Sequence, residues 1–316
     1  MEESEIVKDV AKNATHALGG MICEYKQTGG NLFDTYNTFY EACVQPVMMY
    51  GAGRWGLKEH KKLNAIQNHA CKYFLGLPKT ASNLAARGDM GWLSVKSRQE
   101  LEAVRLWCRL EKMNKKRITY KVHKWSLSRS LRNIKTIEYH VRLLLKKSNL
   151  LHLATGSDIN PKTVVNMYRE YVNIQDKQEW HVQIWDDSHN VTNGNKLRLY
   201  RQFKNDICTE SYLTSTIPYQ HRKYLAMFRS GCLPLEVELG RRDGTPLEKR
   251  FCKMCCQNVV EDKIHILLKC PLYDDVRSRL LSNIHDTGMS LLQQFIQILS
   301  CPEQQAALAK SIFRKA

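Results

Sequence analysis

The chain has 316 residues, of which 43% are hydrophobic and 25% are charged, and its formal net charge is +17 at pH 7. That length allows two or three modules, and that composition gives most of the chain enough apolar surface to fold. No apolar run reaches the ~18 residues of a membrane-spanning helix, and the acidic start MEESEIVKDV is unlike a secretion signal. We therefore expect an intracellular protein, nuclear or cytoplasmic, and neither a secreted nor a membrane-spanning one.

Hydrophobic periodicity predicts a helical bundle in the first third of the chain. A helix is expected over residues 4–26, and another follows with five residues on its inward face: Leu32, Tyr36, Phe39, Tyr40 and Cys43. A third helix is expected near residues 58–75, with the apolar stripe Leu63, Ile66, Ala70 and Phe74. A longer helix should begin after Ser94, with Trp107 inward and Arg105 and Arg109 outward. Residues 1–113 are thus predicted to form a small all-helical domain.

The middle of the chain, residues 114–205, is predicted to be a basic and mostly helical connector. Helices are expected at 137–147 and from Pro161 onward, with Asn160 as the N-cap, and a polar turn is expected at 188–195. No sheet larger than a hairpin is indicated. The predicted fold class is therefore mostly α, with residues 206–316 forming a third region.

The positive charge is concentrated in one stretch. Residues 105–147 hold fourteen Lys or Arg against only Glu111 and Glu138, a formal balance of +12. Four aromatic residues are interleaved with these charges: Trp107, Tyr120, Trp125 and Tyr139. The pattern suits a phosphate backbone with bases packed on the rings, although a solvated helix face with core aromatics is the alternative. An anionic membrane is less favoured, because no strongly apolar face is expected beside the charge.

Four cysteines and a histidine lie within residues 252–270, and four of these residues have a metal-ligand spacing. The pattern is Cys252-x2-Cys255-x9-His265-x4-Cys270, which predicts one closed, structural Zn²⁺ site within a small segment at 250–283. Cys256 could replace Cys255, and a Cys–His nucleophile pair is a less simple use of these residues. A helix should follow from Pro271, with Asp274 and Asp275 in its first turn. Three lysines are expected to offset the charge of the site: Lys253, Lys263 and Lys269.

Several short motifs occur in a defined order along the chain. The first group is Tyr50-Gly51, Trp55-Gly56, Gln67-Asn68 and Leu75-Gly76-Leu77-Pro78, and the last is EDKIHILLKCPLYDDVR with two of the ligands. This order resembles the part of non-LTR (LINE-like) retrotransposon reverse transcriptases that follows the polymerase palm. The resemblance spans residues from about 15 to 280 and is weak from 115 to 190. It implies a thumb-like bundle, a cysteine-rich end that binds RNA, and association with other proteins of such an element.

The chain departs from that family in two respects. Gly53 stands where the family has a glutamate before the tryptophan, and no [Phe/Tyr]-x-Asp-Asp segment supplies the paired aspartates of a palm. The pairs Asp186-Asp187 and Asp274-Asp275 each follow an aromatic residue directly and lack that spacing. We therefore expect no enzymatic activity from this chain.

The leading functional hypothesis is a non-catalytic nucleic-acid-binding protein with one structural zinc, and the resemblance alone favours RNA over duplex DNA. The residues expected to contact phosphates are Arg105, Arg109, Lys115, Lys116, Arg117, Lys121 and Lys124, and, beside the zinc segment, Arg241, Arg242, Lys249 and Arg250. One alternative is a degenerate remnant or a protein-interaction scaffold without nucleic-acid function. Another is an accessory part of an RNA-directed DNA polymerase whose palm is elsewhere. A sequence-specific zinc-finger factor is disfavoured, since there is one zinc segment without tandem repeats.

Overall fold

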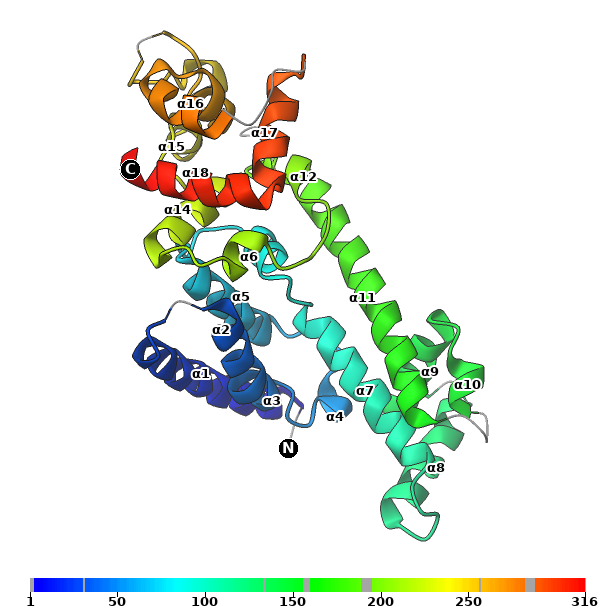
Figure 1. The fold of residues 1–316 in the computed structure, drawn as a ribbon. Helices are drawn as coiled ribbons and strands as arrows, with labels where there is room; N and C mark the ends of the chain where they lie inside the picture. The colour runs from blue at the N-terminus through cyan, green and yellow to red at the C-terminus, as the bar shows by residue number, and fades with distance from the viewer. Residues whose placement is uncertain are drawn as a thin grey trace. The chain divides into compact units, whose positions relative to one another are not determined.

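The computed structural model describes residues 3–30, 32–132, 134–155, 160–188, 195–255, 257–281 and 288–315. Within these ranges the chain is mostly α-helical and contains no strand, only the isolated bridges Met90–Thr209 and Phe251–Val260 (Figure 1). The predicted mostly-α class is confirmed. Most of the predicted polar turn, residues 189–194, lies outside the described residues. None of the described helices combines the length and the apolar character that a membrane crossing requires.

The chain forms two compact units, each built from several parts of the sequence. Unit 1 comprises Met1–Gly30, Thr35–Gln67 and Leu93–Glu179, and unit 2 comprises Asn31–Asp34, Asn68–Trp92 and Trp180–Ala316. The predicted boundaries at 113 and 205 do not coincide with these units. Residues 68–92 group with the C-terminal half because they pack against it, as the hydrogen bond from the Trp180 indole Nε1 to the Leu84 carbonyl shows, at 2.9 Å.

Unit 1 contains long helices joined by short ones. Their bounds are α1 Glu3–Gln27, α2 Phe33–Phe39, the π-turn η1 Tyr40–Val44, α3 Gln45–Met48, α4 Ala52–Trp55, α5 Lys61–Leu75, α7 Val95–Glu111, α8 Ile118–Ser130, α9 Ile137–Lys147, α10 Leu151–Thr155 and α11 Pro161–Trp185. Helices α5 and α11 continue into unit 2. The predicted stripe on α5 is confirmed, since all of its four residues are buried.

The π-turn η1 changes which residues of the second helical segment face inward. Residues spaced four apart are buried: Tyr36, Tyr40, Val44 and Met48. A π-turn is wider than an α-turn, so it keeps residues four apart in line across the join. An uninterrupted α-helix was expected here, so the inward position predicted for Cys43, which is exposed, was wrong. The inward position predicted for Leu32 was also wrong, because Leu32 precedes α2 and is 61% exposed.

The part of unit 1 that holds the basic stretch is organised around α7, α9 and α11, which pack on one apolar core (Figure 1). The core takes Val104, Trp107 and Cys108 from α7, together with Val141 from α9 and Tyr168 from α11. As predicted, Ser94 caps α7, with its hydroxyl accepting from the Ser97 N–H at 3.1 Å. The Asn160 side chain likewise accepts from the Lys162 N–H, at 2.9 Å, at the start of α11.

The departure at Gly53 has a steric reason. Gly53 lies in α4, which packs on α7, and a Cβ added at this position would lie 2.8 Å from the Leu106 Cβ and 3.1 Å from the Glu102 carbonyl oxygen. Real Cβ atoms do not approach other atoms as closely as the first of these distances, so the contact admits no side chain without a backbone shift. A glutamate at this position is therefore incompatible with the observed packing of α4 on α7.

Unit 2 is built from shorter helices. They are α6 Asn83–Met90, α12 Tyr200–Phe203, α13 Ser211–Thr214, α14 Tyr219–Ser230, α15 Glu236–Arg242, the 3₁₀ turn η2 Leu247–Lys249, the π-turn η3 His265–Lys269, the 3₁₀ turn η4 Pro271–Tyr273, α16 Asp274–Leu281, α17 Leu291–Ser300 and α18 Pro302–Lys315. Aromatic side chains fill its core, with ring centroids 5.4 Å apart for Tyr200–Phe203 and 6.1 Å apart for Phe203–Phe295. The expected helix after Cys270 is present as η4 and α16, with Asp274 and Asp275 in the first turn of α16.

A buried ion pair joins distant parts of unit 2. The Asp89 carboxylate accepts from the Arg229 Nε at 2.9 Å and from the hydroxyl groups of Tyr200 and Tyr212, each at 2.9 Å. Burial alone would raise the pKa of Asp89, but the Arg229 guanidinium lowers it below its usual value. Arg229 also lies 2.9 Å from the Glu210 carboxylate. Because Asp89, Arg229 and the two tyrosines are buried, each depends on its partners to offset the cost of losing water.

Candidate functional site

The four predicted metal ligands converge in unit 2. One ligand atom from each of Cys252, Cys255, His265 and Cys270 lies within 4.8 Å of every other, and the Cys255 Sγ is 3.4 Å from the His265 Nε2. In a tetrahedral zinc site, bond lengths of about 2.3 Å to sulfur and 2.0 Å to nitrogen place such S and N atoms about 3.5 Å apart. The residues therefore fit a closed four-ligand metal site. Cys256, the alternative ligand, lies outside the described residues.

Backbone pairing around the cluster explains how nearby sequence positions reach one centre. The Cys252 N–H donates to the Val259 carbonyl at 2.8 Å and the Glu261 N–H to the Arg250 carbonyl at 2.9 Å, which folds the CxxC pair back over the next segment. Asp262 then accepts from the His265 N–H at 2.8 Å, at the start of η3. The Cys270 N–H closes that turn on the His265 carbonyl at 2.7 Å, which returns the fourth ligand to the centre.

The pKa shifts of the four side chains indicate their protonation states before a metal binds. Burial raises the pKa of Cys252 to about 11 and also raises that of Cys270, so both side chains are neutral thiols in the metal-free form. The Gln257 backbone N–H, hydrogen-bonded to the Cys255 sulfur, lowers the pKa of Cys255. Burial lowers the pKa of His265, which leaves a neutral imidazole free to bind a metal through nitrogen. A bound cation would supply the charge that turns the thiols into thiolates.

The basic residues near the cluster were expected to contact phosphates, which requires exposure to solvent. Not all of them are exposed. Arg250 is only 4% exposed and donates to the carbonyl oxygens of Thr245 and Val237, at 2.8 and 2.9 Å. It holds the segment together, so it is removed from the set of phosphate contacts. Arg241 pairs with Glu238 at 3.3 Å, and Arg242, which is exposed, pairs with Asp243 at 3.2 Å. Lys249 is exposed.

The three lysines expected to offset the charge of the cluster have different environments. Lys253 pairs with Glu236 at 2.9 Å, and Lys269 is exposed. Lys263 is buried and donates to the Arg229 carbonyl at 2.9 Å, and burial lowers its pKa to about 7. Lys263 therefore serves the packing of unit 2.

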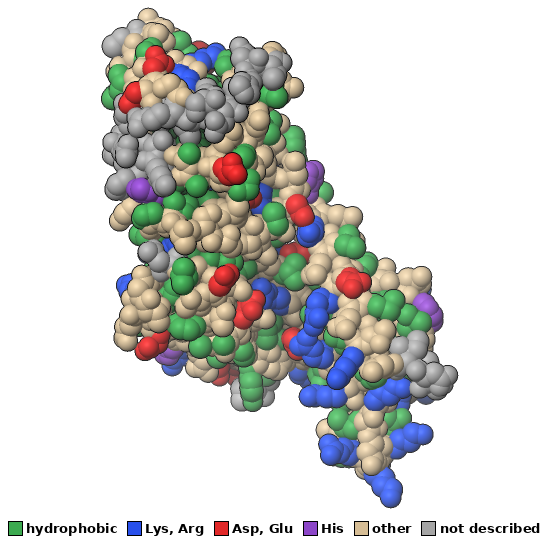
Figure 2. Space-filling model, viewed as in Figure 1, with side chains coloured by type: hydrophobic (Ala, Val, Ile, Leu, Met, Phe, Trp, Pro, Cys, Tyr) green, Lys and Arg blue, Asp and Glu red, His purple; other side chains and the backbone are tan. Residues whose placement is uncertain are grey.

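A second candidate site is the basic surface of unit 1. Figure 2 shows Lys and Arg side chains gathered over α8 and the neighbouring end of α7. Most of the predicted contacts are exposed: Arg105, Arg109, Lys115, Lys116, Arg117 and Lys121. Lys124 is half-buried and its Nζ lies 2.6 Å from the Glu111 carboxylate, so it is already paired. Among the described residues, no ion pair involves Arg109, Lys121 or residues 115–117.

Both acidic residues of the basic stretch are held by one buried histidine. The His123 Nε2 lies 2.9 Å from Glu111 and its Nδ1 lies 3.3 Å from Glu138, while Ser126 also hydrogen-bonds to Glu138. Burial alone would lower the pKa of His123, but the hydrogen bonds to Glu111 and Glu138 raise it above the usual value. Burial alone would raise the pKa values of Glu111 and Glu138, and the hydrogen bonds from His123 lower both. The cluster joins α8 to α7 and α9 and turns both carboxylates away from the outer surface.

This cluster predicts a specific pH dependence for the stability of unit 1. Its histidine contribution is fully present below about pH 6.5 and is lost as pH rises through the raised pKa of His123. Its carboxylate contribution is present above about pH 4.3 and is lost as pH falls through the lowered pKa values of the glutamates. The difference in free energy of unfolding between the wild type and His123→Gln should therefore peak between these values, at about 1.5–3 kcal/mol. Urea unfolding from pH 4 to 9 measures it.

The control for that experiment is His16→Gln, since His16 is an exposed residue of α1. We expect this variant to follow the wild type within about 0.5 kcal/mol at every pH. A difference between the wild type and His123→Gln that stays constant with pH would show that the histidine acts only through packing.

The four aromatic residues of the basic stretch divide into core and surface. Trp107 is 2% exposed and belongs to the apolar core, so it is a core aromatic residue and not a surface for a base. Trp125 is 60% exposed, with the Arg129 guanidinium 4.9 Å from its ring centre. Tyr120 and Tyr139 are half-buried. Trp125 is thus the most exposed of the four rings.

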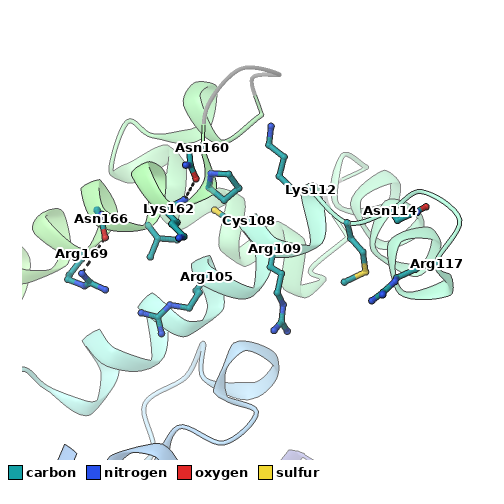
Figure 3. Close-up of a pocket in the computed structure, with 13 residues that line it drawn as sticks. Arg105, Cys108, Arg109, Lys112, Asn114, Arg117, Asn160, Lys162, Asn166 and Arg169 are labelled. Atoms are coloured by element: carbon teal, nitrogen blue, oxygen red, sulfur yellow. Dashed lines mark hydrogen bonds between the residues drawn. The ribbon is translucent and has the colours of Figure 1, made fainter.

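An open pocket of about 910 Å³ lies among α7, the 112–117 segment and the start of α11. Figure 3 shows cationic side chains from all three elements around Cys108. The cations that line it are Arg105, Arg109, Lys112, Arg117, Lys162 and Arg169. The first, second and fourth were predicted from sequence. Lys162 and Arg169 lie on α11, at least 45 residues further along the chain, and only their basic character marked them beforehand.

The comparisons with known proteins do not identify the chain. No family model matches it, and neither a curated protein nor a solved structure matches it.

Proposed function

We propose that this chain is a nucleic-acid-binding protein whose binding surface lies on unit 1 and whose unit 2 contains one structural Zn²⁺. The observation that carries the proposal is the His123 cluster. Both carboxylates of residues 105–147 are held by His123, and Arg109, Lys121 and residues 115–117 form no ion pair among the described residues. Arg105 pairs with Glu102. A surface of this kind favours a polyanion, since binding releases the counterions that condense on phosphates.

Two further features support a nucleic acid over other polyanions. Trp125 is exposed within the basic surface, and an exposed ring gives a base a surface for stacking that a simple charge patch lacks. Arg109 and Arg117 contribute guanidinium groups to the surface, and a guanidinium can bond to a phosphate through two N–H groups at once. RNA is favoured over duplex DNA by the resemblance to LINE-like reverse transcriptases alone. In that resemblance the chain would serve as the part of an element protein that holds the template.

Zinc is the metal we propose for the cluster of Cys252, Cys255, His265 and Cys270. Three soft thiolates and one imidazole at tetrahedral spacing form the ligand set that zinc prefers, and they leave no position open for water or substrate. The site is therefore assigned a structural role. The exposed cations beside it, Arg242 and Lys249, are a secondary surface at most, because Arg241 is paired and Arg250 is buried.

Charge reversal on the surface of unit 1 tests the proposed function. The variant Lys115→Glu/Lys116→Glu/Arg117→Glu should weaken binding of a fluorescein-labelled 20-nucleotide RNA at least tenfold at low salt. It should also lower the slope of log affinity against log salt by about 2, since about 0.7 counterions are released per single-strand phosphate contact. Helix α8 should tolerate the change, because added carboxylates at a helix N-terminus interact favourably with its dipole.

The matched control is Lys8→Glu/Lys12→Glu/Lys62→Glu, which changes the net charge of the same unit by the same amount at exposed positions of α1 and α5. It should retain most of the affinity and the slope. Equal losses in the two variants would mean that only net charge matters and would remove the surface from the proposal. Binding that neither variant changes would remove unit 1 altogether.

A second candidate, an anionic membrane surface, is favoured by one observation on α8. Ile118, Val122 and Trp125 are 72%, 54% and 60% exposed, and their spacing places them on one side of the helix. This exposed row is an apolar feature beside the positive charge that the sequence pattern did not indicate. Sedimentation with phosphatidylserine vesicles at 150 mM salt tests the candidate: binding lost in Trp125→Ala, without any effect on RNA affinity, would favour it.

A further inference from the structure

The pocket among α7, the 112–117 segment and α11 combines two kinds of lining that a simple phosphate-binding surface does not need. Around its edge are the cations already named, and no acidic residue of the described chain lines it. Its inner wall is apolar, with Cys108 and Val165 4% and 8% exposed and with Met113 and Pro161 beside them. Charge outside and apolar surface inside match the two halves of a nucleotide.

Three asparagine side chains complete the lining. Asn114, Asn160 and Asn166 each use the side-chain oxygen as acceptor: from the Lys116 N–H at 2.9 Å, from the Lys162 N–H at 2.9 Å and from the Arg169 guanidinium at 3.3 Å. The second and third of these bonds are drawn in Figure 3. Each amide NH₂ group has no hydrogen-bond partner among the described residues. These NH₂ groups are therefore available as donors, of the kind that bonds to the edge of a base.

From this lining we infer that the pocket holds one unpaired nucleotide of a bound strand, with its base against Cys108 and Val165 and its phosphates on the surrounding cations. The inference rests on the proposed function and narrows it. A volume of about 910 Å³ is ample for one nucleotide. A base stacked inside a duplex cannot enter such a pocket without leaving the stack, which costs a few kcal/mol. The protein should therefore prefer single strands and loops over a duplex.

The test fills the pocket without changing its charge. Asn166 is exposed on α11 and lines the pocket, so Asn166→Trp should occupy the space of the base. Met167→Trp is the matched control, because Met167 is the next residue, is 39% exposed and does not line the pocket. Asn166→Trp should weaken binding of a 20-nucleotide single-stranded RNA roughly tenfold, to the affinity of the corresponding duplex, while Met167→Trp should bind like the wild type.

A second measurement distinguishes the base from the phosphate and a free nucleotide from a strand. Saturation-transfer NMR with adenosine 5′-monophosphate should show transfer to the base protons in the wild type and none in Asn166→Trp. Inorganic phosphate at tenfold excess should reduce this signal only partly. Complete displacement by inorganic phosphate, or transfer to ribose protons alone, would overturn the inference in favour of a phosphate site. Tight AMP binding with no effect of Asn166→Trp on RNA affinity would indicate a free nucleotide as the ligand and would also overturn it.

Failure of this inference can be separated from failure of the proposed function. RNA binding that the charge reversal at residues 115–117 weakens, but that Asn166→Trp leaves unchanged, would contradict the pocket assignment alone. RNA binding that neither variant affects would contradict both.

Discussion

Replacing Cys270 by serine is expected to abolish tight zinc binding and to unfold the segment around residues 250–281 while the helices of unit 1 stay folded. A structural zinc site contributes an apparent free energy on the order of 10 kcal/mol, and this energy is coupled to the folding of the segment that holds it. Cys270 is fully buried between its partner ligands, so serine leaves both an incomplete tetrahedron and a buried hydroxyl. Elemental analysis of dialysed protein and hydrogen exchange of the amides of 252–270 measure the two effects.

The control for this variant is Cys23→Ser, since Cys23 is an exposed cysteine of α1 outside the cluster. It should retain one zinc per chain and the exchange pattern of the wild type. The proposal of a zinc site would be contradicted by a wild type that carries no zinc after preparation with excess metal. It would equally be contradicted if Cys270→Ser kept a full equivalent of zinc with slow exchange at His265.

Asp89→Ala is expected to destabilise unit 2 by about 3–5 kcal/mol. The substitution leaves the Arg229 guanidinium, which is 0% exposed, with Glu210 as its remaining carboxylate. It also removes the acceptor of the Tyr212 hydroxyl and one of the two acceptors near the Tyr200 hydroxyl. Breaking a buried pair by removing one partner costs this much because the other charge stays buried with less compensation. Chemical denaturation monitored by tryptophan fluorescence measures the loss, and Trp180, buried in unit 2, provides the signal.

Two further variants separate charge from packing at Asp89. Asp243→Ala removes an exposed carboxylate with an exposed partner, so it should change the free energy of unfolding by less than about 0.5 kcal/mol. The double variant Asp89→Leu/Arg229→Met replaces the pair by apolar side chains and should recover part of the stability that Asp89→Ala loses. If the double variant is less stable than Asp89→Ala, the pair contributes through hydrogen-bond geometry more than through mutual neutralisation.

Features that depend on neighbouring residues could be predicted from the sequence. The apolar stripe of α5, the Ser94 cap of α7 and the Asn160–Pro161 start of α11 follow from spacings within one or two turns, where helix geometry alone decides which residues are neighbours. The cluster of Cys252, Cys255, His265 and Cys270 belongs to the same group, because these residues lie within nineteen positions and backbone turns bring them together. The fold class followed from the same periodicities.

Features that depend on contacts between distant segments could not be predicted. Asp89 and Arg229 lie 140 residues apart, and nothing in either local sequence shows that they pair. In the sequence, Arg250 cannot be told apart from an exposed arginine that contacts phosphate. In the structure its guanidinium donates to the carbonyl groups of Thr245 and Val237. For the same reason only three of the six cations that line the pocket were predicted from the sequence. Its walls come from α7 and α11, and the packing of those helices brings together cations that are distant in sequence.

The segment at residues 40–44 illustrates a different limit. Tyr36, Tyr40, Val44 and Met48 are spaced four residues apart. In a regular α-helix of 3.6 residues per turn, each of them would lie about 40° further around the helix axis than the one before. The π-turn absorbs the drift, and it is visible only once the buried face is known. A strict spacing of four over three turns, together with Pro46, is the signal that could have indicated it.

Mapping where a bound strand lies tests the central claim most directly. A single-stranded RNA that contains 4-thiouridine would be crosslinked to the wild-type protein by long-wavelength ultraviolet light, and the modified peptides identified by mass spectrometry after digestion. The account predicts crosslinks within residues 105–132, with Trp125 among them, and within the first two turns of α11. Crosslinks found only outside these two segments, under conditions in which most of the RNA is bound, would contradict it.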